Sequence, residues 1–214
     1  MHNTAVEVFS QWAMEGRDVG MENGHAPSVE VLISKLLPRL RDQFKSIDVG
    51  CGNGWTVRKL SKLTDCALSM GVDGSPAMID KAKKIDPEGT YQVGNLPGWA
   101  PMDKVDLVFS MEFIYYLENP FEFIRSVHDN WLLDGGTIAI GMDHYLENET
   151  SLSWPGSMNL KMTTLSIKDW LFEFKRAGFT NIEYYQTGRK DNWAGTLIIL
   201  GTKEGYNNGQ IIKV

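Results

Sequence analysis

The stretch that decides the fold runs Ser46-Ile47-Asp48-Val49-Gly50-Cys51-Gly52-Asn53-Gly54. A short apolar run leads into glycines at alternate positions, which predicts a buried strand, a tight loop and the start of a helix. A second apolar run follows and ends at Val72-Asp73-Gly74. An acid at the tip of the next strand can accept hydrogen bonds from both hydroxyls of a ribose. Together these residues predict a site for an adenosine-containing ligand.

The spacing of the glycines indicates which class of adenosine-containing cofactor the loop would bind. The nicotinamide fingerprint G-x-G-x-x-G has its third glycine where this chain has Trp55. Here the third glycine is Gly54, and Asp48 precedes the loop by two residues. This Asp-x-Gly-x-Gly-x-Gly pattern resembles the class I (Rossmann-like) S-adenosylmethionine-dependent methyltransferases of the small-molecule type. An acid in that place can attract the methionyl ammonium group directly or through water, although Asp48 can also simply cap a turn.

Composition limits the classes of partner. The chain has 214 residues, 43% hydrophobic and 22% charged, which suits one globular domain. Its net charge of -6 argues against nucleic acid as a partner, because phosphate-backbone binding needs a basic surface. Cys51 and Cys66 form no disulfide framework and lack metal-ligand spacing, so we expect a cytoplasmic protein without a metal. We also expect no signal peptide and no membrane segment, and either a monomer or a homodimer.

Alternating strands and helices predict an α/β fold with a parallel sheet. The family resemblance implies a doubly wound, mostly parallel seven-stranded sheet with an antiparallel last strand and helices on both faces. The expected strands cover 45–49, 68–73, 91–93, 105–110, 137–141, 181–186 and 196–202. Helix starts are predicted at three caps followed by helix-forming residues, at Ser75-Pro76, Asn119-Pro120 and Ser166.

Three segments lie outside the regular pattern. Residues 1–43 are predicted to form a helical cap or lid, with Ser28 as the N-cap of a helix that ends near Leu37. Residues 44–202 form the Rossmann-like domain, within which 143–165 is a long connection that we interpret as a substrate lid. Residues 203–214 are expected to be a flexible tail. The alternative for the first segment is a helix packed on the flank of the sheet without ligand contact.

The resemblance also implies which residues hold the cofactor, S-adenosyl-L-methionine. Asp73 would bind the ribose hydroxyls, Asn95 would lie beside the adenine amino group, and Ser110 would line the methionine arm. The full expected set lies at the ends of four strands: Asp48, Gly50, Gly52, Asn53, Gly54, Asp73, Gly74, Ser75, Met78, Gly94, Asn95, Leu96, Ser110 and Met111. Asn95 is also an ordinary turn residue, and Met78 is also an ordinary core residue of a helix.

The acceptor site is less sharply indicated. Enzymes that methylate exocyclic amines of nucleic-acid bases typically have Asn/Asp-Pro-Pro-Tyr/Phe after the fourth strand, whereas this chain has Ser110-Met111-Glu112-Phe113. Trp12, Arg17 and Tyr115 are candidates for substrate binding. His144, His25 and Tyr115 are candidates for a catalytic role, because histidine can act as a general base for a hydroxyl acceptor. Each of these side chains can equally be structural.

The sequence therefore predicts an enzyme that transfers a methyl group from S-adenosylmethionine to an oxygen, nitrogen or sulfur atom of a small-molecule acceptor. Three alternatives remain open: a non-catalytic S-adenosylmethionine-binding module, a methyltransferase acting on protein or tRNA, and a nicotinamide-dependent oxidoreductase. The glycine spacing speaks against the last of these.

Overall fold

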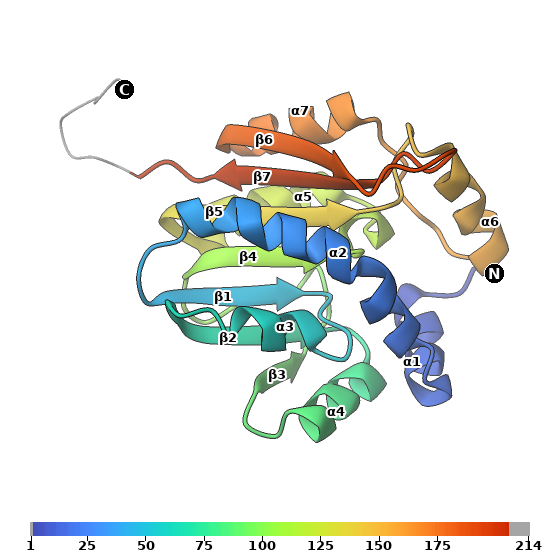
Figure 1. Ribbon diagram of the computed structural model, residues 1–214, viewed down its shortest axis with the longest axis horizontal. Helices are drawn as coiled ribbons and strands as arrows, with labels where there is room; N and C mark the ends of the chain where they lie inside the picture. Colours follow the sequence, from blue (N-terminus) through green and yellow to red (C-terminus); the bar gives the residue numbers. More distant parts are fainter. Residues whose placement is uncertain (1, 206–214) are drawn as a thin grey trace.

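A computed structural model describes residues 2–205, and it contains one seven-stranded sheet (Figure 1). The strand order is β3-β2-β1-β4-β5-β7-β6, and β7 runs antiparallel to both of its neighbours. The fold class predicted from the sequence is confirmed. The strands are β1 (Phe44–Val49), β2 (Cys66–Asp73), β3 (Thr90–Val93), β4 (Val105–Met111), β5 (Leu132–Met142), β6 (Thr180–Thr187) and β7 (Thr196–Thr202).

Helices cover both faces of the sheet, as the alternating pattern predicts. In Figure 1, α2 and α3 cross the near face, while α5 and α7 lie behind the sheet. The helical elements are α1 (Ala5–Glu15), α2 (Asp18–Leu36), η1 (Leu37–Arg39), α3 (Trp55–Leu60), α4 (Pro76–Ile85), η2 (Ile114–Tyr116), α5 (Pro120–Ser126), the π-helical η3 (Val127–Trp131), η4 (Glu149–Ser153), α6 (Trp154–Met158) and α7 (Ile167–Ala177).

The core follows the two faces of β4, which is buried along its whole length. Leu107 and Phe109 pack with the apolar face of α2, whereas Val108 packs with Trp131 and the α5–α7 side. A strand buried on both faces does not alternate between apolar and polar residues, so apolar residues stand at neighbouring positions. Its two polar residues, Asp106 and Ser110, are hydrogen-bonded to the backbone of β1. Trp131 and Trp170 are fully buried, and burying a large aromatic side chain contributes roughly 2–3 kcal/mol.

The predicted helix starts are present. Ser75, Asn119 and Ser166 each accept a hydrogen bond from a backbone N–H in the first turn of α4, α5 and α7. Gly178 ends α7 in the left-handed conformation, which a residue with a side chain adopts at a cost.

The predicted start at Ser28 is wrong. The helix begins ten residues earlier, at Asp18, and passes through Pro27. Gly20, Gly24 and Pro27 lower the helix propensity of this segment, so its sequence does not look helical. Tertiary contacts override that preference: Ser28 Oγ bonds Thr196 Oγ1 of β7 at 2.7 Å, and the same helix buries its apolar face on the sheet.

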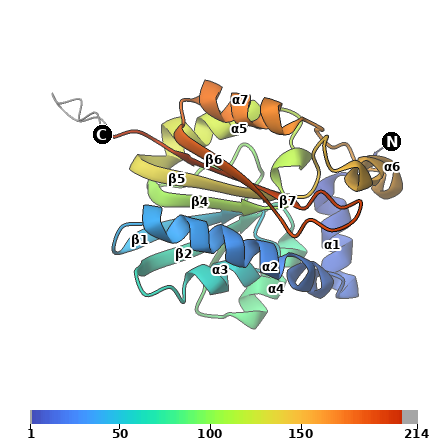
Figure 2. The same cartoon turned by 45° about the horizontal axis from the view of Figure 1, so that its top comes forward.

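The connection from residue 143 to 165 shows no obvious helix or strand pattern in the sequence, yet it contains η4 and α6. Figure 2 shows α6 near α1, at the edge of the sheet where the parallel strands end. A backbone hydrogen bond of 3.0 Å from Asn3 N to Asn159 O joins the two regions. Most of the expected tail, residues 206–214, lies outside the described residues.

Candidate cofactor and acceptor site

The glycine loop after β1 forms the floor of the site. Gly50, Gly52 and Gly54 all have positive φ angles, of 74°, 53° and 78°. A Cβ atom on Gly50 would lie 2.7 Å from Cβ of Phe113, and one on Gly54 would overlap the ring of Tyr91. The loop therefore needs glycine for conformation and for space. It lies where β1 and β4 are neighbours and the strand order reverses, the usual ligand position in such sheets.

Asp73 ties this loop to the end of β2. One carboxylate oxygen accepts a hydrogen bond from Gly52 N at 2.9 Å, and the other accepts one from Ser75 N at 2.7 Å. Burial raises the pKa of Asp73, while these two backbone hydrogen bonds oppose the shift. The side chain is thus held at the end of β2 by the backbone on either side of it.

A cavity of about 390 Å³ opens above the loop. Eight of the residues expected to bind the cofactor line it: Gly50, Gly52, Asp73, Gly74, Met78, Asn95, Leu96 and Met111. A second cavity, of about 50 Å³, shares Glu112 with the first and is lined by Asp48 and Asn53 of the expected set. Burial raises the pKa of Asp48 well above its usual range, and the nearby Asp73 raises it further.

Four of the expected cofactor residues line neither cavity. Ser110 donates a hydrogen bond to Val49 O at 2.8 Å, which joins β4 to β1. Gly94 leaves room for Val72 and Trp99. Ser75 caps α4, and its hydroxyl also lies 2.7 Å from Ser10 Oγ of α1. Gly54 leaves room for Tyr91. All four therefore support the strand ends and loops around the site and do not line its cavities.

Helix α1 covers the large cavity. Thr4, Ala5, Val6 and Phe9 line it from this side, and Val6 Cγ2 would lie 2.8 Å from a Cβ on Gly74. The Phe9 ring packs edge-on against Tyr116, with 5.3 Å between centroids. Helix α1 therefore contacts both the end of the cavity that is expected to bind the ribose and the aromatic side chain of Tyr116, which follows β4.

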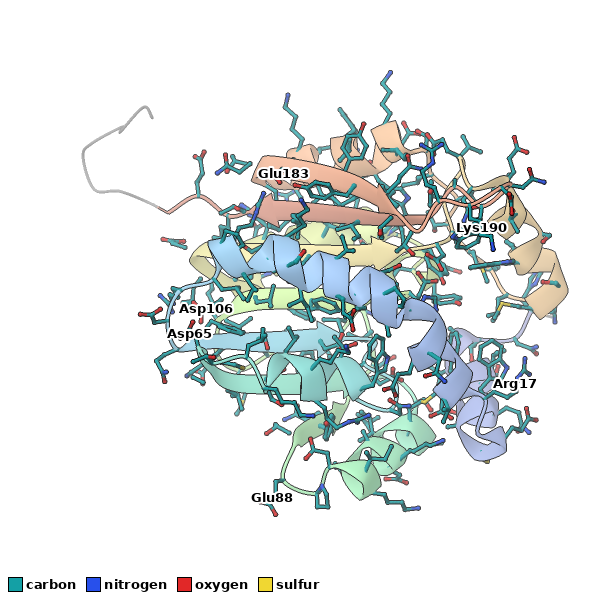
Figure 3. All side chains as sticks on the ribbon, viewed as in Figure 1. Arg17, Asp65, Glu88, Asp106, Glu183 and Lys190 are labelled. Atoms are coloured by element: carbon teal, nitrogen blue, oxygen red, sulfur yellow. The ribbon has the colours of Figure 1, made fainter. Side chains whose placement is uncertain are left out.

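The residues expected to bind substrate lie elsewhere. Trp12 and Arg17 line a separate open groove with Gln11 and Glu15, and the Arg17 guanidinium lies 4.3 Å above the Trp12 ring. Figure 3 shows Arg17 at the outer edge of the molecule, beside α1. Tyr115 is buried and lines neither cavity; its hydroxyl donates to Glu112 Oε2 at 2.7 Å. The neighbouring Tyr116 faces the cavity instead.

The two candidate histidines differ in their surroundings. His144 is fully buried, with Nδ1 at 3.0 Å from Ser151 O and Nε2 at 2.8 Å from Thr164 Oγ1, so both ring nitrogens are occupied by structural partners. His25 lines the small cavity, and its Nδ1 lies 3.5 Å from Asp143 Oδ2. Burial lowers the pKa of His25, and the Asp143 charge opposes that shift.

The set of expected site residues did not include Glu112, Asp143, Phe9 and Met21. Glu112 and Asp143 directly follow β4 and β5, so the argument that singled out Asp73 at the end of β2 applies to them as well. Glu112 also has a φ of 57°, an uncommon conformation for a residue with a side chain. The positions of Phe9 and Met21 depend on how α1 and α2 fold over the sheet, for which the sequence carries no local signal.

Comparisons with known proteins agree with this geometry. Residues 47–140 match the family model described as "Methyltransferase domain". A chain of the complex between the Haloferax volcanii Trm112 methyltransferase activator and a methyltransferase superposes with a TM-score of 0.81 at 25% identity, covering 92% of this chain and 98% of that one. A chain of the DhpI–S-adenosylhomocysteine complex gives 0.67 at 16% identity, with coverages of 93% and 95%.

Curated relatives include two enzymes named trans-aconitate 2-methyltransferase. The one from Azoarcus sp. (strain BH72) is 26% identical over 157 residues, which cover 69% of this chain and 62% of the relative. The one from Escherichia coli O1:K1 is 29% identical over 122 residues, with coverages of 56% and 47%. The chain thus spans about half the length of the curated relatives it matches.

Fold, glycine loop and family match together define a class I, Rossmann-like methyltransferase domain, a class of enzymes whose cofactor is S-adenosylmethionine. Residues 47–140 of this chain match that class. Within residues 2–205, no helix combines the length and the apolar character needed to cross a bilayer.

Proposed function

We propose that the chain transfers the methyl group of S-adenosylmethionine to a small-molecule acceptor bound beneath α1. The observation that carries this proposal is the covered cavity, which extends from Asp73 to the aromatic side chains Phe9 and Tyr116. The names of the curated relatives also support a small acceptor.

The chain's own residues would mainly position the reactants. When bound, S-adenosylmethionine supplies a methyl group already activated by its sulfonium. Asp73 would accept hydrogen bonds from the ribose hydroxyls, Asn95 and Leu96 would contact the adenine, and Asp48 would attract the methionyl ammonium group; all four line the two cavities. Held in this way, the cofactor would present its methyl carbon to the acceptor atom, and the walls of the cavity would keep the two in line. Alignment and exclusion of water account for much of such catalysis.

The N-terminal segment would act as the lid of this site. The contact between Ser10 and Ser75 and the packing of Val6 over Gly74 place α1 directly on the turn that follows β2. A ligand in the cavity would have to pass α1 to enter or leave. The segment 143–165 would help to hold this lid in place, through the backbone hydrogen bond from Asn3 N to Asn159 O.

The lining gives a chemical clue to the acceptor. Neither cavity is lined by a Lys or Arg among the described residues. Trans-aconitate, the acceptor in the relatives' names, is an anion, so an acceptor of that kind would need another source of positive charge. A tRNA acceptor would find no basic side chain among the described residues that line these cavities, which favours a small molecule over a nucleic acid.

The test is product formation from a metabolite mixture. Purified chain is incubated with S-adenosylmethionine and a low-molecular-mass metabolite extract, with trans-aconitate in a parallel sample, and S-adenosylhomocysteine is measured by mass spectrometry. We expect the product to accumulate only with the extract or the acid, and not in the matched Asp73→Ala sample. Cofactor binding without turnover in any sample would favour a non-catalytic binding module.

Assembly is a separate proposal. We expect a monomer or a homodimer, and one solved neighbour is in a complex with the Trm112 methyltransferase activator. Light scattering of the purified chain, alone and mixed with an activator of that type, measures the assembled mass. A stable mixed complex would contradict the expectation that the chain is a monomer or a homodimer.

A further inference from the structure

Three side chains from distant parts of the sequence converge beside the small cavity. His25 comes from α2, Glu112 follows the end of β4, and Asp143 follows the end of β5. One nitrogen or oxygen atom of each lies within 4.8 Å of those of the other two. Ligands bound to one cation at about 2.0–2.2 Å lie roughly 3–4.4 Å apart, so small side-chain rotations would suffice to coordinate an ion.

The unused atoms of this cluster are the second observation. Asp143 Oδ1 and Glu112 Oε1 are both shielded from solvent and make no hydrogen bond in the described structure. The Asp143 side chain is only 7% exposed. Among residues 2–205, neither carboxylate forms an ion pair with a Lys or Arg. Buried carboxylate oxygens are normally paired or bound to a metal, because leaving them alone costs several kcal/mol.

The histidine geometry points the same way. His25 Nδ1 and Asp143 Oδ2 are 3.5 Å apart, which is longer than a good hydrogen bond. A carboxylate that only oriented an imidazole for proton transfer would normally lie closer to it. A separation of 3.5 Å is, by contrast, what two ligands of one metal ion show.

We propose that His25, Glu112 and Asp143 bind a divalent first-row metal cation. One imidazole and two carboxylates suit Mn²⁺ or Zn²⁺ better than a cation that binds oxygen alone. Three protein ligands leave coordination positions open for water or for a substrate oxygen. This proposal replaces the sequence-based expectation of a metal-free site, and it makes His25 a ligand and not a general base.

The position of the site links it to the acceptor. Glu112 lines both cavities, and His25 lines the small one, so a cation here would supply the positive charge that their linings lack. An acceptor that presents a carboxylate or a hydroxyl oxygen would bind such a cation. This last step rests on the proposed methyl transfer, whereas binding of the cation does not.

The test is binding of Mn²⁺ to the full chain after treatment with EDTA and gel filtration. Electron paramagnetic resonance measures free Mn²⁺ during a titration. We expect one saturable site per chain and at least tenfold weaker binding in Asp143→Asn and, separately, in Glu112→Gln. The matched control is Asp129→Asn, an exposed carboxylate that lies 2.8 Å from His128, and it should bind as the unchanged chain does.

Binding of S-adenosylhomocysteine in EDTA is measured on every variant. It tests the cofactor site independently of the metal, and far-ultraviolet circular dichroism shows whether each variant is folded. Absence of saturable Mn²⁺ binding, or equal binding in Glu112→Gln and the unchanged chain, would overturn the metal site. A chain that binds Mn²⁺ but not S-adenosylhomocysteine would keep the metal site and contradict the proposed function.

Discussion

The carboxylate of Asp73 accepts a hydrogen bond of 2.9 Å from the backbone N–H of Gly52, a residue of the preceding strand–loop unit. The contact joins the glycine loop after β1 to the acid after β2. Two features that are separate in sequence thereby form one rigid edge of the cofactor cavity, and the acid is oriented before any ligand arrives.

We expect Asp73→Asn to weaken binding of S-adenosylhomocysteine at least 100-fold, about 2.7 kcal/mol. Asn has one acceptor oxygen where Asp73 has two, so bonds to Gly52, Ser75 and the ribose hydroxyls cannot all be kept. Isothermal titration calorimetry measures the loss. Asp65→Asn is the control, because Asp65 is exposed at the opposite edge of the sheet (Figure 3). Equal affinities in the two variants would contradict the ribose role.

Asp48→Asn should make the free chain more stable and the cofactor complex weaker. Burial raises the pKa of Asp48 in the folded state above its ordinary value of 3.8. The folded state therefore holds the proton more strongly, and stability is lost as the pH rises from about 3.8 through the raised pKa. Above that range the ionised carboxylate destabilises the fold, and Asn does not.

Thermal unfolding at pH 5 and pH 8 measures this difference. The melting temperature of Asp48→Asn should exceed that of the unchanged chain by more at pH 8 than at pH 5. Its affinity for S-adenosylmethionine should fall about tenfold, or 1.4 kcal/mol. If Asp48→Asn is less stable than the unchanged chain at pH 8, or binds S-adenosylmethionine equally well, then Asp48 is not a buried acid kept for binding the methionyl ammonium group.

Cofactor binding should order α1. The helix lines the cavity with Val6 and Phe9 and contacts the β2 turn through Ser10. Hydrogen exchange followed by mass spectrometry should show amides of 5–15 exchanging at least fivefold more slowly with S-adenosylhomocysteine bound. The loop between β6 and β7, which carries Lys190 (Figure 3), serves as the internal control and should not change. Unchanged exchange in α1 would mean that it is not a lid.

His144→Ala should affect stability and not binding. Both ring nitrogens of this buried side chain form hydrogen bonds, to Ser151 O and Thr164 Oγ1, and the ring packs between Tyr115 and Trp154. Removing it should lower the free energy of unfolding by about 2–4 kcal/mol, measured by urea denaturation. Affinity for S-adenosylhomocysteine should stay within threefold. His2→Ala, at an exposed position, is the control, and a large loss of affinity in His144→Ala would restore a role for this residue in the site.

The sheet was predictable because its signals are local. Each strand is a short apolar run, and the caps at Ser75, Asn119 and Ser166 are properties of a few adjacent residues. The start of α2 was not predictable, because Gly20, Gly24 and Pro27 weaken the local helix preference and contacts with β7 and the sheet outweigh it.

The same distinction applies to the site. Gly50, Gly52 and Asp73 could be placed from their positions at strand ends, since parallel strands end at one edge. The meeting of His25 with Glu112 and Asp143 needs three elements to be positioned at once. Trp12 and Arg17 were singled out by residue type alone, and they line a separate groove between α1 and α6.

Calorimetric titration of the purified chain with S-adenosylhomocysteine and, separately, with NADH measures which of the two cofactors the cavity binds. We predict one S-adenosylhomocysteine site per chain with a dissociation constant on the order of 1–10 µM, about −7 to −8 kcal/mol, and no heat from NADH. Binding of NADH alone, or of neither ligand, would contradict this prediction.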